Sequence, residues 1–102
     1  MTASHPPLSA LLTVAIPVSD QDRAKTLFEG LGFTETMDAE LQPGFRWIEL
    51  VLPGADTTIS LVAAGDELPA GLDTGIRFAA PDARAAHTTL AALGLKVGEL
   101  LD

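Results

Sequence analysis

Three side chains of this sequence could bind a small molecule if the chain forms a sheet. Residues 45–52 alternate, so that Trp47 and Glu49 share one face of a strand while mainly apolar residues occupy the other. With Arg77 they would line a cleft with an aromatic ring, an acid and a base. That combination suits an amphipathic ligand, because the ring supplies contact area and the charges fix orientation. The alternative interpretation is that Trp47 packs in a core or a dimer interface and that Glu49 and Arg77 form a plain ion pair.

The sequence offers little support for catalysis. Glu49 is the one acid placed to act as a general base in such a cleft, and a carboxylate without a positioned partner makes a weak catalytic site. His5 and His87 lack partners at a metal-binding or catalytic spacing, and we interpret both as non-functional. The chain has no cysteine, and the GxGxxG, P-loop, HExxH and GxSxG patterns are missing. We therefore predict no catalytic residue.

Composition limits the classes of partner. The 102 residues are 47% hydrophobic and carry a net charge of −8, from fourteen acids and six bases. The bases are scattered, which excludes nucleic acid, and the acidic surplus either provides solubility or favours cationic partners. No apolar run approaches the roughly 20 residues that span a bilayer, which argues against a membrane partner. Residues 1–10 look like a flexible tail rather than a signal peptide. We expect a cytoplasmic protein.

Two segments of the chain repeat one plan. Residues 11–32 and 72–94 each run from an apolar strand through an aspartate to an amphipathic helix that ends in Leu-Gly. The two aspartates are Asp20 and Asp82. Each copy has to bury its helix against its own sheet, and two curved half-sheets side by side create a cleft.

The first copy predicts the order strand–helix–strand–strand–strand. Residues 11–18 are almost continuously apolar, which predicts a strand buried on both faces. Ser19 is the expected helix N-cap, and Gly32 is the expected left-handed stop. The residues expected on the inner stripe of the helix are Ala24, Leu27, Phe28 and Leu31. The further strands are expected at 33–41, 45–52 and 57–63, with a turn at 53–56.

The second copy is shorter. It predicts a strand at 74–80, a helix at 82–93 and a strand near 96–101. In the first of these Ile76 and Phe78 would pack inward, and in the helix the inward residues would be Ala86, Leu90 and Leu93. We therefore expect a first module at 11–65, a linker at 66–71 and an incomplete second module at 72–102. Either the natural chain is longer or another subunit completes the sheet.

Three stretches of the chain resemble the vicinal oxygen chelate superfamily, which includes glyoxalase I, bleomycin-resistance proteins and extradiol dioxygenases. They are VAIPVSDQDRAKTLFEGLGF (14–33), GFRWIELVLPGADTTISLV (44–62) and TGIRFAAPDARAAHTTLAALG (74–94). The resemblance implies an α+β fold of tandem βαβββ modules, which form a curved mixed sheet around a cleft. It says less about function, because this scaffold hosts many chemistries.

Enzymes of this family resemble one another in holding a divalent metal with His, Gln or Glu on the first and last strands of each module. The matching positions here are Thr13, Ser60 and Gly75, and a fourth would lie beyond Asp102. Hydroxyls are weak substitutes for these ligands, so we predict no metal and no cofactor. The strand period of two nevertheless turns Thr13 and Ser60 toward the cleft. The predicted ligand-binding residues are Thr13, Trp47, Glu49, Ser60 and Arg77.

The prediction for function is a small-molecule-binding protein that resembles the glyoxalase and bleomycin-resistance group but lacks the usual metal ligands. We expect a homodimer, because a sheet edge has to be covered. One alternative is a metal-dependent lyase or dioxygenase whose ligands come from a missing tail or a partner chain. Another is an assembly module whose cleft is filled by its own side chains.

Overall fold

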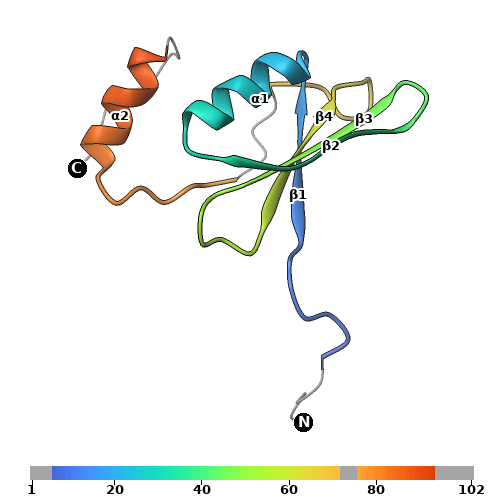
Figure 1. Ribbon diagram of the computed structural model, residues 1–102, viewed down its shortest axis with the longest axis horizontal. Coiled ribbons are helices and arrows are strands. Elements are labelled where there is room, and N and C mark those ends of the chain that lie inside the picture. Colours follow the sequence, from blue (N-terminus) through green and yellow to red (C-terminus); the bar gives the residue numbers. More distant parts are fainter. Residues whose placement is uncertain (1–5, 72–75, 94–102) are drawn as a thin grey trace. The chain divides into compact units, whose positions relative to one another are not determined.

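The computed structural model describes residues 6–71 and 76–93, which belong to two compact units, residues 1–71 and 72–102. Among these described residues the first unit holds a sheet and one helix, and the second holds one helix (Figure 1). The elements are β1 Thr13–Val18, α1 Gln21–Gly30, β2 Thr34–Gln42, β3 Phe45–Val51, β4 Thr58–Ala63 and α2 Ala83–Ala92. This order confirms the five elements predicted for the first copy, and the chain has an α+β fold.

The four strands form one mixed sheet in the order β1-β4-β3-β2. β1 runs parallel to β4, whereas β2 with β3 and β3 with β4 are antiparallel. The first strand of the module therefore lies directly beside its last strand, although 39 residues separate Val18 from Thr58. This pairing brings residues from the two ends of the module together.

The core lies between α1 and one face of the sheet. Ile48, Leu50 and Leu61 have no exposed surface, and Ile59 and Phe33 complete the buried cluster. Three members of the predicted helix stripe pack against this cluster, namely Ala24, Phe28 and Leu31. The rings of Phe28 and Phe33 meet edge to face, with centroids 5.3 Å apart and an interplanar angle of 87°.

The N-cap of α1 is Asp20, so the prediction of Ser19 is wrong by one residue. Asp20 is extended, its Oδ1 accepts a hydrogen bond of 3.1 Å from the Arg23 amide, and its carbonyl accepts the first helical bond. Both residue types cap well, and tertiary contacts decide between them. The Gln21 side-chain amide donates to the carbonyls of Arg46 and Leu61, at 2.9 Å each. These bonds tie the first helical residue to β3 and β4.

The C-terminal end of α1 follows the prediction. Gly32 has a φ of +106°, a conformation that favours glycine. The Phe33 amide then donates to the Phe28 carbonyl at 3.1 Å, and the Gly32 amide to the Glu29 carbonyl at 3.1 Å. This reversal places Phe33 back in the core.

β1 is less buried than its apolar sequence predicted. Pro17 is buried, but Ala15 is exposed and the other residues of the strand are half-buried. Within the described residues β1 pairs only with β4, so it is an edge strand of this sheet. The apolar run indicated a strand correctly but not a fully buried one.

The second unit repeats the helix ends of the first. α2 begins after Asp82, whose Oδ1 accepts a bond of 3.0 Å from the Ala85 amide, and its C-cap is Leu93. These are the counterparts of Asp20 and Leu31 in α1. Both helices have ten residues, which confirms the helical part of the repeat.

The strand predicted at 74–80 is not present in its described part, residues 76–80. Phe78 and Leu93, both expected to point inward, are exposed, whereas Ala86 and Leu90 are half-buried. Within residues 76–93 the one described element is α2. Residues 74–75 and the strand predicted near 96–101 lie outside the described residues.

No helix within residues 6–71 and 76–93 combines the length and the apolar character that a membrane crossing requires.

We predict that Leu61→Ala lowers the free energy of unfolding by about 2–5 kcal/mol, because it removes a fully buried side chain and leaves a cavity. Urea denaturation followed by circular dichroism measures the change. Leu8→Ala is the matched control, because Leu8 is exposed, and its effect should stay within about 0.5 kcal/mol. Equal effects of the two substitutions would contradict the assignment of the core.

Candidate functional site

The sheet face opposite α1 collects four of the predicted site residues. Because side chains alternate, the face that does not carry the core bears Thr13 of β1, Trp47 and Glu49 of β3, and Thr58 and Ser60 of β4. The strand register supports this assignment, since Ser60 pairs with both Ala15 and Glu49 and paired residues lie on the same face. We call this group of five residues the distal face.

Glu49 is held in place on the distal face. The Trp47 indole Nε1 donates a hydrogen bond of 2.7 Å to its Oε1. The Thr58 hydroxyl lies 3.4 Å from its Oε2 and 3.3 Å from the Leu12 carbonyl, so its one proton is shared between these two acceptors. Both groups that contact the carboxylate are neutral. Glu49 and Trp47 are both half-buried, so the carboxylate is oriented and still reaches the surface.

An apolar surface adjoins this carboxylate. The rings of Phe45 and Trp47 lie with centroids 6.0 Å apart and are tilted by 48°. Phe45 is 43% exposed, and Met37, which pairs with Glu49 across β2 and β3, is 40% exposed. Exposed aromatic and thioether groups beside a fixed polar group are typical of sites that bind organic molecules.

Thr13 and Ser60 lie side by side, as the positions implied by the family resemblance require. Their hydroxyls hydrogen-bond to each other across β1 and β4. Ser60 is fully buried and Thr13 is half-buried. Of this pair, Thr13 is therefore the one that a ligand could reach.

These two residues do not fit a divalent metal. Neutral hydroxyls are poor ligands, and here each is already engaged by the other. Within residues 6–71 and 76–93, no three side chains among His, Cys, Asp and Glu gather in a way that could hold a metal ion. The third matching position, Gly75, lies outside the described residues.

Arg77 belongs to the second unit. It is exposed, and its Nη1 donates to the Ile76 carbonyl at 3.2 Å. Its place beside Glu49 stays a prediction. His87 of α2 is half-buried.

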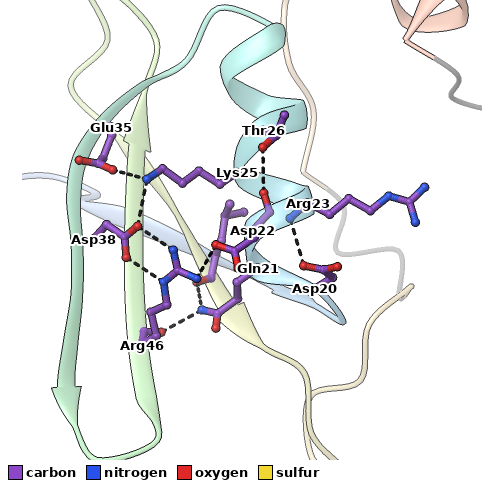
Figure 2. Close-up of polar contacts among 10 residues, drawn as sticks. Asp20, Gln21, Asp22, Arg23, Lys25, Thr26, Glu35, Asp38 and Arg46 are labelled. Atoms are coloured by element: carbon purple, nitrogen blue, oxygen red, sulfur yellow. Dashed lines mark hydrogen bonds and ion pairs between the residues drawn. The ribbon is translucent and has the colours of Figure 1, made fainter.

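A charged network on the other side of the sheet was not predicted from the sequence (Figure 2). The Arg46 guanidinium forms two bonds of 2.8 Å with the Asp38 carboxylate and a third, of 2.7 Å, with Asp22 of α1. Lys25 of α1 binds the same Asp38 at 2.9 Å and also binds Glu35. We call these five residues the ion network. The alternation of β3 contained the signal, since it turns Arg46 toward the helix that carries Asp22 and Lys25.

The ion network shifts the ionisation of its members. The bonds from Arg46 first, and from Lys25 second, hold the pKa of Asp38 well below its usual range. The bond to Glu35, followed by that to Asp38, raises the pKa of Lys25 above its usual value. Lys25 and Asp38 are thus charged at neutral pH, and the ion network joins α1 to β2 and β3.

Several solved structures resemble the chain. The first is TnmS3, described as an antibiotic binding protein from Streptomyces sp. CB03234, with a TM-score of 0.77 and 31% identity over 88% of this chain and 74% of that chain. A member of the glyoxalase/bleomycin resistance protein/dioxygenase superfamily from Sphaerobacter thermophilus DSM 20745 has the same TM-score and identity, over 87% and 74%. The chain belongs to this superfamily.

A third structure, a glyoxalase/bleomycin resistance protein from Streptomyces sp. CB03234, has a TM-score of 0.69 and 31% identity over 83% of this chain and 75% of that chain. These structures confirm the resemblance to the vicinal oxygen chelate superfamily that the sequence indicated. A scan against protein-family models gave no match, and a search of curated proteins also gave none.

We predict that Asp38→Asn lowers the melting temperature by several degrees near pH 7, because Arg46 and Lys25 lose a shared carboxylate. Since the folded-state pKa of Asp38 is depressed, its contribution is fully present above the unfolded-state pKa of about 4 and is lost as the pH falls toward the folded-state value. The difference between wild type and variant should therefore shrink below about pH 4.

Thermal unfolding followed by circular dichroism between acidic and neutral pH tests this prediction. Asp56→Asn is the matched control, because it removes the same charge from an exposed residue outside the ion network. A difference between Asp38→Asn and wild type that stays constant down to the lowest pH would contradict the assignment.

Proposed function

We propose that this chain is a small-molecule-binding member of the superfamily, which holds an organic ligand on its distal face without a metal. The carboxylate of Glu49, oriented by Trp47 and Thr58, carries the proposal, together with the exposed ring of Phe45 that packs against Trp47. Such a surface offers both contact area and a directional polar contact. The likeness to TnmS3, an antibiotic binding protein, supports the same class of function.

In this proposal Thr13 and Ser60 do not bind a metal but help to bind the organic ligand. Thr13 would exchange a hydrogen bond with the ligand, while buried Ser60 holds Thr13 in position. We further propose that the protein is a cytoplasmic homodimer whose partner subunit completes the sheet.

Trp47 provides a direct test, because it is the single tryptophan of the chain. We predict that at least one member of a panel of natural-product antibiotics changes the intensity or wavelength of its fluorescence in a saturable way. Phe45→Ala should weaken that ligand about tenfold, because an aromatic contact is lost. A broad panel that leaves the emission unchanged would contradict a ligand site at Trp47.

Native mass spectrometry of the whole protein tests the metal and the oligomer together. We predict a dimer without a bound divalent ion, because the positions matched to the metal ligands hold only the hydroxyls of Thr13 and Ser60. Incubation with zinc, nickel, iron or manganese should leave that mass unchanged. One tightly held ion per site would instead favour the metal-dependent lyase or dioxygenase, with ligands from other parts of the assembly.

A further inference from the structure

We infer that the ligand is an amphipathic organic cation, whose amine binds Glu49 and whose apolar body packs on Phe45 and Trp47. This inference rests on the small-molecule-binding function proposed above and names the chemical class of the ligand.

The first argument is the unused capacity of the Glu49 carboxylate. Two carboxylate oxygens offer about four acceptor positions, and the side chains of the first unit occupy at most two of them. Trp47 and Thr58 hold the carboxylate in one orientation, so a ligand meets a pre-formed acceptor. Pre-organisation of this kind lowers the cost of binding.

The second argument is charge. Both donors to Glu49 are neutral, so its charge is not compensated by them. Within residues 6–71 the ion pairs belong to the ion network, on the opposite side of the sheet, and Glu49 takes part in none. A half-buried carboxylate without a counter-ion is unfavourable, and a cationic ligand would offset that cost.

The third argument is the character of the neighbouring surface. Phe45, Trp47 and Met37 present aromatic rings and a thioether beside the carboxylate. Aromatic faces attract cations as well as apolar groups. The net charge of −8 adds a long-range attraction for cations and opposes anions.

Three probes of matched shape test the inference on the whole protein, namely phenethylamine, phenethyl alcohol and phenylacetate. They share an aromatic ring and differ in carrying a positive charge, none or a negative charge. The readout is the indole N–H signal of Trp47 in heteronuclear NMR, because this hydrogen is bonded to Glu49. We expect the amine to bind about tenfold more tightly than the alcohol, since charge-assisted hydrogen bonds are roughly twice as strong as neutral ones.

Glu49→Gln keeps the size and a carbonyl acceptor of the side chain but removes its charge. It should weaken the amine about tenfold and change the alcohol by no more than about twofold. Glu29→Gln is the matched control, because it removes the same charge from an exposed residue of α1. It should leave the affinity for the amine within about twofold, which separates the local contact from the overall field.

The wild-type ranking of the probes decides the inference even if Glu49→Gln fails to fold. If the amine and the alcohol bind equally, or if phenylacetate binds most tightly, the inference of a cationic ligand is wrong, while the proposed small-molecule-binding function stands. If no probe moves the indole signal but an antibiotic from the fluorescence panel does, the inference again fails alone. If neither does, the inference and the proposed function both fail.

Discussion

The packing of α1 against one face of the sheet is the interaction on which the rest of the first unit depends. It requires Ile48, Leu50 and Leu61 on the helix side. Because strand side chains alternate, their neighbours Trp47, Glu49 and Ser60 then have to lie on the distal face. A slip of β3 by one residue would bury the Glu49 carboxylate against the core and expose Ile48. The core therefore selects the residues of the candidate site as well as stabilising the fold.

The two sides of the sheet use charge in different ways. The ion network compensates each charge locally, and Asp38 is shared by a lysine and an arginine that come from different elements. On the distal face, Glu49 is oriented by neutral donors and keeps its charge available. The ion network joins α1 to β2 and β3, whereas the arrangement around Glu49 is suited to binding a ligand. The carboxylates of Asp38 and Glu49 thus differ in role because they differ in their partners.

Membership of the superfamily identifies the fold but not a ligand, since the scaffold hosts several chemistries. The parallel pairing of β1 and β4 brings Thr13 and Ser60 together from opposite ends of the module. With side chains of other types, the same pairing would bring two metal ligands together. Here the pairing joins two hydroxyls, and the charged residue of the distal face is Glu49. The difference lies in side-chain chemistry and not in the backbone.

The sequence by itself determined the elements of the first unit, the ends of both helices to within a residue, and the face on which Trp47 and Glu49 lie. These features follow from periodicity and from local residue types, which act within a few positions. Only the tertiary structure decided that Asp20 and not Ser19 caps α1, that residues 76–80 form no strand, and which partners Glu49 and Arg46 have. The physical reason is that Thr58 reaches Glu49 from a neighbouring strand and that Asp22 and Asp38 reach Arg46 from α1 and β2, so these bonds depend on strand register and on how α1 docks.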